Sequence, residues 1–459
     1  MGGPAVKSLA SLSTRSAKVL GPPSRQGTVI IVVLVIVILI SLAAYNFTLS
    51  MESEHLATRN GGDRLACRQA AFSVVEVLAS IMERPRSQRL ADTLPINQPI
   101  DLWPDDTDAA DKSDWKLQAV VYQGPNASGS EPSQRLLTES AKLNLRSSGP
   151  GGSPSPDSLQ QSLLRLPGMT AETAADILQS LGRPTRNSGK PVDDGPAIVE
   201  LLPQHTSDLS SDSDNPSDAW RTWVTMCSAE RNETFEGLPR ININADSLTQ
   251  LHQQLSKRVP LPVANFIVLA RQHGINKTSS ANTPLDSVNV DLNRRSIYRF
   301  ESLTELFDSS VSVSESNRKR QTVASPIDRV NGAAGLDVAR LLDQLTLTSA
   351  RRLVGRVDVA TAPVEVLAVV PGLDTTSAGA IVNARSSDSN GWVHPIAALA
   401  SSGLSATVVD TALPYLTVGG DVVKVTVVGR LGQHGPTYRC RVLVDASWGK
   451  TRWSVLSVR

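Results

Sequence analysis

The sequence has few of the residues that stabilise small secreted domains or form metal and redox sites. It contains three cysteines in 459 residues, Cys67, Cys227 and Cys440, and only 4% aromatic residues. Three widely separated cysteines provide neither a disulfide framework nor a C-x-x-C motif. We therefore expect buried free thiols, with one long-range disulfide as the alternative.

Net charge and catalytic motifs are also lacking. The formal net charge is +1, so the chain as a whole has no strong electrostatic attraction to nucleic acid or anionic lipid. No G-x-S-x-G, P-loop or H-E-x-x-H motif occurs, and no two histidines lie at metal-ligand spacing. We expect no enzymatic activity. The histidines are His55, His205, His252, His273, His394 and His434.

Two acidic segments are the candidates for a cation site. Calcium takes several oxygen ligands from loops of this kind, although acidic loops are often simply solvated. Calcium is therefore left open as a cofactor, without assigned ligands, and no other cofactor is expected. The carboxylates are Asp105, Asp106, Asp108, Asp111 and Asp114 in one segment, and Asp212, Asp214 and Asp218 in the other.

A long apolar run near the N-terminus is the strongest signal in the sequence. Residues 1–27 carry four cations and no acid, and no charge occurs between Arg25 and Glu52. As a helix, residues 28–51 would extend about 36 Å, enough for a hydrocarbon core about 30 Å thick. The basic flank predicts a cytoplasmic N-terminus and an exported bulk.

Three kinds of N-terminal segment fit this run. One is a plain signal anchor. A second is a cleaved secretory signal, whose apolar region is usually about 7–15 residues, shorter than this run. The third is a prepilin leader, cut between Gly27 and Thr28 so that the apolar helix is retained.

The helical pattern continues beyond the apolar run. Apolar residues recur at helical spacing as far as Ile81, and Pro85 ends the pattern, which predicts one helix of about 55 residues. Gly61 and Gly62 mark a point where this helix could bend. A globular domain packed on its second half would explain the amphipathic part.

The remaining segments alternate between sheet and helix. We expect strands at 115–122 and 220–227, a strand or strand end at 135–145 around Leu143 and Leu145, a linker at 147–158 before a helical region, and loops at 276–289 and 308–335. Further strands are expected at 415–418, 421–430, 437–446 and 452–458. The fold class is α+β, a small antiparallel sheet divided by a helical insertion. The predicted domains are 1–27, 28–84, 85–146, 147–414 and 415–459.

Two segments of the insertion align as an internal repeat. Residues 240–248 and 356–367 share a basic residue, a β-branched residue, Asn or Asp, a second β-branched residue and then a helix start. Ala245 and Asp246 suit the cap and first turn in one copy, and Thr361 and Pro363 do so in the other.

Two Pro-Gly turns, Pro167-Gly168 and Pro371-Gly372, are typical of helix-hairpin-helix units. In nucleic-acid binders such turns present backbone N–H groups to a phosphate. Thr170 and Asp374 occupy tip positions usually held by glycine, Glu172 adds negative charge, and Arg356 and Arg385 are the nearby cations. We expect structural turns, with DNA capture by a membrane-tethered protein as the alternative function.

Taken in order, these motifs resemble the protein K family of type II secretion systems, which are large minor pseudopilins. The resemblance rests on Gly27 before the cut, Val32 at the fifth mature position, and residues 138–145, 240–245, 356–373 and 415–428. Most pseudopilins carry Glu where protein K, like this chain, has an apolar residue. The family's aromatic-Arg-Asp segment is absent near residues 181–194.

The resemblance implies a fold, a location and partners. The fold is a pilin fold with a helical domain inserted into its sheet, and calcium sites are known in the family. The chain would cross the inner membrane once, with its bulk in the periplasm. Its partners would be a prepilin peptidase, other minor pseudopilins, the pseudopilus and the inner-membrane secretion platform.

Overall fold

The computed structural model describes residues 26–89, 94–102, 116–123, 136–146, 156–182, 220, 222–277, 283–314, 320–327, 335–385, 391–432 and 435–458. It is an α+β structure with a long N-terminal apolar helix. The chain divides into two compact units, Met1–Asp63 and Arg64–Arg459. We describe each unit by itself.

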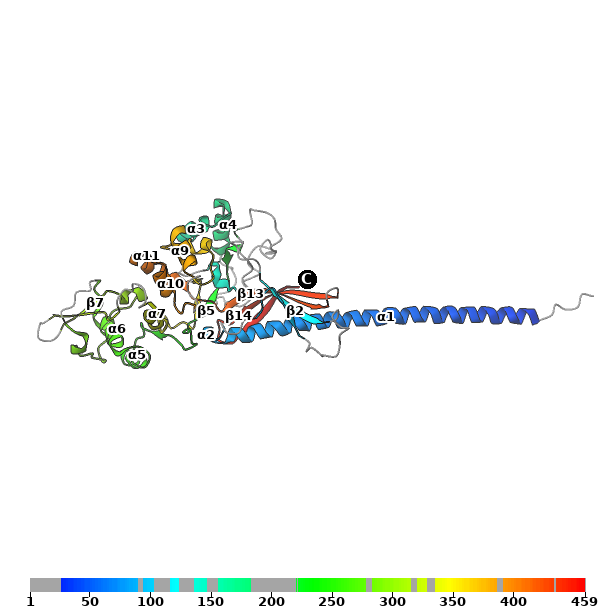
Figure 1. The fold of residues 1–459 in the computed structure, drawn as a ribbon, viewed down its shortest axis with the longest axis horizontal. Coiled ribbons are helices and arrows are strands. Elements are labelled where there is room, and N and C mark those ends of the chain that lie inside the picture. The colour runs from blue at the N-terminus through cyan, green and yellow to red at the C-terminus, as the bar shows by residue number, and fades with distance from the viewer. Residues whose placement is uncertain are drawn as a thin grey trace, which may run out of the picture. The chain divides into compact units, whose positions relative to one another are not determined.

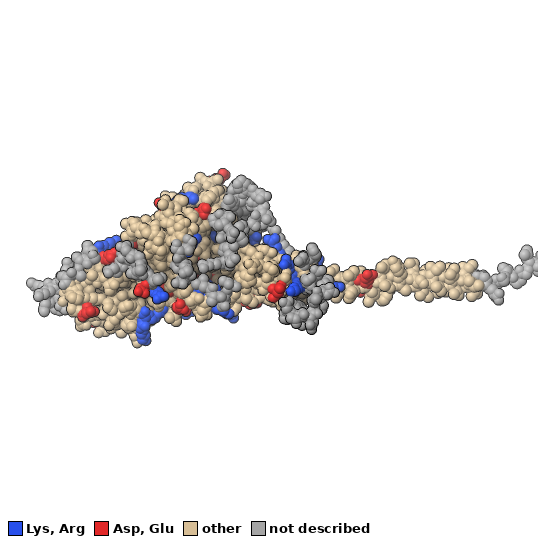
Figure 2. All heavy atoms as spheres, viewed as in Figure 1, with Lys and Arg blue, Asp and Glu red and all other residues tan. Residues whose placement is uncertain are grey.

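The first unit consists of the N-terminal part of helix α1 (Gln26–Glu83). Its apolar side chains from Val29 to Met51 are exposed, and in Figure 2 the end of the helix that carries them has no charged groups on the visible face. Among the described residues it is the one helix long and apolar enough to cross a membrane. The prediction of one continuous helix is confirmed, with its end two residues before Pro85.

In the second unit, the last part of α1, from Cys67 onward, packs on a five-stranded antiparallel sheet (Figure 1). The strand order is β1 (Pro99–Asp101), β2 (Leu117–Tyr122), β13 (Val422–Leu431), β14 (Thr437–Asp445) and β15 (Arg452–Val458). Alternate residues of β13 and β14 point toward the helix and are buried, as a strand with one covered face requires. The predicted strands at 421–430, 437–446 and 452–458 are confirmed, whereas the strand expected at 415–418 is β12 (Leu416–Thr417), which pairs with β11 (Val357–Asp358) outside this sheet.

The chain leaves this sheet after β2 and returns to it at β13. Val121 of β2 lies opposite Val427 of β13, so residues 123–421 are inserted between two adjacent strands. The inserted region has its own large apolar core, which includes Phe266, Leu342 and Ile381. The sheet and the insertion therefore bury separate sets of apolar side chains.

The inserted region is built from short helices and two-stranded pairs. Among these helices, most of them labelled in Figure 1, α3 packs with α4, α5 with α6, α8 with α9, and α10 with both α7 and α9. The helices are α3 (Pro156–Leu164), α4 (Ala171–Gly182), α5 (Leu248–Leu255), α6 (Leu261–His273), α7 (Gly335–Asp343), α8 (Val364–Leu367), α9 (Thr375–Arg385), α10 (Pro395–Ser401) and α11 (Ala406–Ala412), and α2 (Arg86–Arg89) precedes the insertion. The strand pairs are β3 (Leu143–Asn144) with β4 (Val224–Thr225), β5 (Ala229–Arg231) with β10 (Arg352–Val354), β6 (Ile241–Asn242) with β9 (Leu345–Thr346), β11 (Val357–Asp358) with β12 (Leu416–Thr417), and β7 (Ser310–Ser314) with β8 (Arg320–Ala324).

Several local predictions were wrong. The expected loop at 308–335 contains the β7–β8 hairpin, because Val311, Val313 and Val323 alternate toward the core. Of the strand or strand end expected at 135–145, only the end is a strand, β3 at Leu143–Asn144; a 3₁₀ turn, Glu139–Ala141, precedes it, since Glu139 is held by Lys142 and Thr225.

Two further details differ from the sequence predictions. The cap of α5 is Ser247, whose hydroxyl accepts from the Gln250 N–H, while Pro363 occupies the N-cap position of α8. Cys67 and Cys440 are buried free thiols as expected, but Cys227 is only partly buried. The caps lie one or more residues later than predicted because each strand is followed by a turn before its helix.

Candidate functional site

The proposed cleavage site lies at the start of α1. Gly27 and Thr28 fall in its first turn, and Val32 follows with its side chain 51% exposed. None of the most apolar part of this helix is buried within the chain. An apolar surface of this length needs lipid or another protein to cover it.

The first Pro-Gly turn connects α3 to α4. Gly168 has φ +76°, a backbone conformation that glycine adopts without steric cost. Beyond it, the Thr170 hydroxyl accepts from the Thr173 N–H at 3.1 Å and so caps α4. The Thr170 side chain therefore occupies the N-terminal end of α4, where a phosphate would otherwise bind.

The second Pro-Gly turn connects α8 to α9. Gly372 has φ +85°, and a Cβ there would lie 2.8 Å from Cβ of Thr411 in α11. The Asp374 carboxylate accepts from the Ser377 N–H at 2.7 Å. This backbone donor lowers the pKa of Asp374. A phosphate at this helix end would have to displace a carboxylate of the chain.

The two turns also contact each other through α3. The Ser162 hydroxyl donates to the carbonyl oxygen of Val369 at 3.3 Å, and the Arg165 guanidinium donates to that of Leu373 at 3.0 Å. Because Thr411 lies against Gly372 on another side, the second turn is enclosed by neighbouring helices. These contacts fit a packing role for Pro167, Gly168, Pro371 and Gly372.

The cations near the second turn have internal partners. Arg385 donates to the carbonyl oxygens of Val359 at 2.7 Å and Ala362 at 2.6 Å. Burial lowers the pKa of Arg385 to about 10, although Asp358 opposes the shift. Arg356 lies 3.5 Å from the Glu230 carboxylate. Neither guanidinium is positioned as an open phosphate contact.

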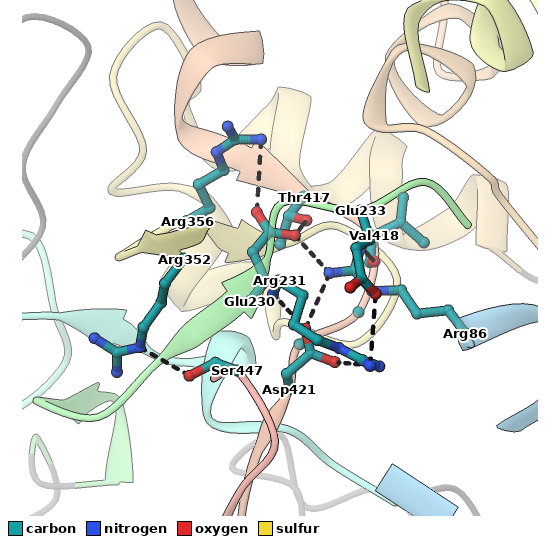
Figure 3. Close-up of polar contacts among 12 residues, drawn as sticks. Arg86, Glu230, Arg231, Glu233, Arg352, Arg356, Thr417, Val418, Asp421 and Ser447 are labelled. Atoms are coloured by element: carbon teal, nitrogen blue, oxygen red, sulfur yellow. Dashed lines mark hydrogen bonds and ion pairs between the residues drawn. The ribbon is translucent and has the colours of Figure 1, made fainter. Parts of the chain in front are cut away.

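A buried ion network lies where α2, β5 and the start of β13 meet (Figure 3). Asp421 is at its centre. One carboxylate oxygen is 2.6 Å from the Arg89 guanidinium, and the other accepts from the Arg231 backbone N–H at 2.5 Å and lies 3.5 Å from Arg86. Three arginines thus converge on one fully buried carboxylate.

Glu230 is the second anion of this network. It accepts from Arg86 at 2.8 Å and from the Thr417 hydroxyl at 2.6 Å, and it faces Arg356. Figure 3 shows Arg86 between the Glu230 and Asp421 carboxylates. Since Arg86 follows the long helix while Glu230 belongs to the inserted region, the network fastens the insertion to the end of α1.

The network keeps both carboxylates ionised. Burial alone would raise the pKa of Asp421, but Arg86, Arg89 and Arg231 reverse this and hold it well below its usual range. Burial likewise opposes ionisation of Glu230, and Arg86, Arg356 and Arg240 lower its pKa overall. A buried charge that loses its partners is strongly destabilising, so these residues are mutually dependent.

The sequence did not indicate this network. The local sequence shows only the adjacent Glu230 and Arg231 within β5, and Asp421 between two glycines and two valines. Arg86 and Glu230 are 144 positions apart, and Arg86 and Asp421 are 335 apart. Pairing over such distances is set by the tertiary fold and leaves no periodic signal.

The predicted cation sites cannot be placed. Both acidic segments, 105–114 and 212–218, lie outside the described residues, as do His205 and His434. Within the described ranges, no group of three or more His, Cys, Asp or Glu could hold a metal ion. His394 acts instead as the cap of α10, accepting from the Ile396 N–H at 3.3 Å.

Comparison with known proteins does not identify a family for this chain. No family model matches the chain, and no significant match was found among the curated proteins or the solved structures.

Proposed function

We propose that this chain is a minor pseudopilin of a type II secretion system, similar to protein K, and that it acts without catalysis at the tip of the pseudopilus. The observation that most supports this proposal is the direct pairing of β2 with β13 in a sheet that packs on the last part of α1, from Cys67 onward. A pilin fold with a domain inserted into its sheet requires this arrangement: a long helix, a small antiparallel sheet, and an interruption between adjacent strands.

The inserted region provides a second line of support, because two parts of it share the same contacts. Asn242 and Asp358 each accept from the N–H two residues later, at 3.0 and 2.9 Å. Arg271 and Arg385, near the ends of α6 and α9, each donate to carbonyl oxygens in the loop that follows the strand. Similar contacts at both places are consistent with repeated helix-hairpin-helix-like units.

The apolar helix supplies the anchor. In the proposal, a prepilin peptidase removes residues 1–27, and the helix from Thr28 holds the chain in the inner membrane before packing with other pseudopilins. The bulk then lies in the periplasm, and the secretion platform in the inner membrane drives assembly.

Val32 favours the leading position in the fibre. An ionised Glu there would need a cation within the bilayer, such as the N-terminal amine of the subunit ahead, because an unpaired charge in hydrocarbon is costly. A leading subunit meets no such amine. A large inserted domain is also tolerated more easily at a fibre end than along its shaft.

N-terminal sequencing of the protein extracted from membranes tests the proposal. A mature chain that begins at Thr28 supports it. A chain that still begins at Met1, or one that begins after residue 51, would rule out a prepilin and leave a signal anchor or a cleaved secretory signal.

The alternative function, DNA capture outside the membrane, has less support. Thr170 and Asp374 occupy the helix ends that would bind phosphates, and Arg356 and Arg385 are engaged within the chain. Binding of duplex DNA that weakens steeply with salt would favour this alternative.

A further inference from the structure

The two edges of the five-stranded sheet differ in how they are protected. Natural proteins protect sheet edges with short strands, proline and charged residues, because an open edge pairs with other chains. The β1 edge follows this rule, with three residues that include Pro99 and Asp101. The β15 edge has seven residues and no proline, and Arg452 at its start is its one charged residue.

The outer side of β15 is unoccupied by the described part of the chain. Residues 452–458 pair with β14 and make no other backbone hydrogen bond to a described residue. Val455 and Val458 are 37% and 55% exposed. The ladder shifts register at Arg441 and Val442, so its uninterrupted part runs from Arg452 to Val455.

The edge is held rigidly by α1. The indole N–H of Trp453 donates to the Glu76 carboxylate at 2.9 Å, and the Phe72 ring lies 5.5 Å from that of Trp453. Just before the strand, the Thr451 N–H donates to Glu83 at 3.0 Å. A strand fixed in its extended form loses little conformational entropy when another strand pairs with it.

Side chains on the two faces of the edge define what would fit. Trp453 and Val455 lie opposite Val444 and Val442, which are buried under α1, so this side is apolar. On the other face, Arg452 of β15 and Arg439 of β14 are exposed. Arg452 lies opposite Asp445 of β14, which is 3.8 Å from the Arg352 guanidinium, and the Arg452 guanidinium is 6.0 Å from the centre of the Trp448 ring. Ser454 on that face is small and leaves room for a neighbouring side chain.

We propose that the β15 edge is the docking site for an extended segment of another protein, in which apolar residues alternate with acidic residues. The apolar residues would cover Trp453 and Val455, and the acidic residues would face Arg452. Backbone pairing provides affinity in this mode of recognition, and alternate side chains provide specificity. The proposal does not depend on the secretion assignment, because it rests only on the sheet edge.

The test uses the full-length protein in detergent micelles and two ten-residue probe peptides, one alternating Glu with Val and the other alternating Lys with Val. Fluorescence anisotropy gives affinity, and hydrogen exchange locates the protected amides. We expect the Glu-Val peptide to bind at least ten-fold more tightly and to protect residues 452–458.

Two variants at the edge and one matched control make the test specific. Val455→Lys places a charge on the apolar side of the edge and should lower the affinity for the Glu-Val peptide at least ten-fold. Arg452→Glu, at an exposed position, should reverse the preference toward the Lys-Val peptide. Val428→Lys makes the same change as Val455→Lys on a central strand and should leave binding as in the wild type.

Three results would overturn the proposal. One is the absence of binding by the Glu-Val peptide, and another is protection confined to some other segment. The third is protection of residues 452–458 that rises with protein concentration without peptide, which would identify a second copy of the chain as the occupant.

Discussion

The carbonyl oxygen of Cys67 in α1 lies directly over Gly429 of β13. A Cβ built on Gly429 would be 1.9 Å from that oxygen and 3.2 Å from the Ala71 nitrogen. The backbones of helix and strand are therefore in contact, and only a residue without a side chain allows this separation.

Gly429→Ala should destabilise the protein by about 1–3 kcal/mol, because the helix or the strand must move to admit a methyl group. Urea unfolding followed by circular dichroism measures the change. Gly379→Ala is a matched control, since a Cβ at Gly379 in α9 meets nothing within 4 Å. The control should be neutral or stabilising by about 0.5–1 kcal/mol, as expected for a helical position with room for a methyl group.

Asp421→Asn should cost about 3–5 kcal/mol, because it leaves three arginines converging on a neutral side chain in a buried site. The same unfolding measurement applies. Glu301→Gln removes an exposed carboxylate and should stay within about 0.5 kcal/mol of the wild type. Equal effects of the two variants would mean that the buried ion network stabilises the protein no more than an exposed carboxylate does.

Stability should fall when the pH is lowered from 7 to 5, and His394 should cause part of this fall. Burial, with Arg240 and Arg356 nearby, lowers the pKa of His394 well below its usual value. Below about pH 6.5 the unfolded chain therefore binds a proton that the folded protein excludes, which costs up to about 1.4 kcal/mol per pH unit.

His394→Asn should flatten this dependence while keeping a side-chain acceptor for the Ile396 N–H. His55→Asn removes an exposed histidine and should leave the slope as it is. The lowered pKa values of Asp421 and Glu230 also make the protein less stable as the pH falls, but only at lower pH. Their contribution to the free energy of unfolding is fully present above about pH 4 and is lost below it. An unchanged slope in His394→Asn between pH 7 and 5 would contradict the assignment.

Gly27→Leu should leave the precursor uncut, because the proposed peptidase site needs a small residue before Thr28. Immunoblotting of membranes distinguishes precursor from mature chain by a difference of 27 residues. Gly21→Leu changes another glycine of the same segment and should be processed normally. Normal cleavage of Gly27→Leu would count strongly against a prepilin.

The sequence predicted the features that depend on local periodicity. The continuous helix follows from the apolar run and the later amphipathic spacing, and the last three strands follow from alternation between glycine-containing turns. It did not predict the β7–β8 hairpin, where serines interleaved with Val311 and Val313 suggested a polar loop. It also missed the network around Asp421, since no local pattern encodes which distant arginines meet a carboxylate.

The pairing of β2 with β13 sets an order for biogenesis. β2 emerges from the ribosome long before β13, so only the edge of β2 that faces β1 can be paired while residues 123–421 are synthesised. Contacts between distant segments form slowly, and an unpaired strand edge is prone to aggregation during that delay. The sheet therefore closes only after the whole inserted region has been synthesised, and a chain truncated ahead of β13 would leave α1 and an incomplete sheet exposed to proteolysis.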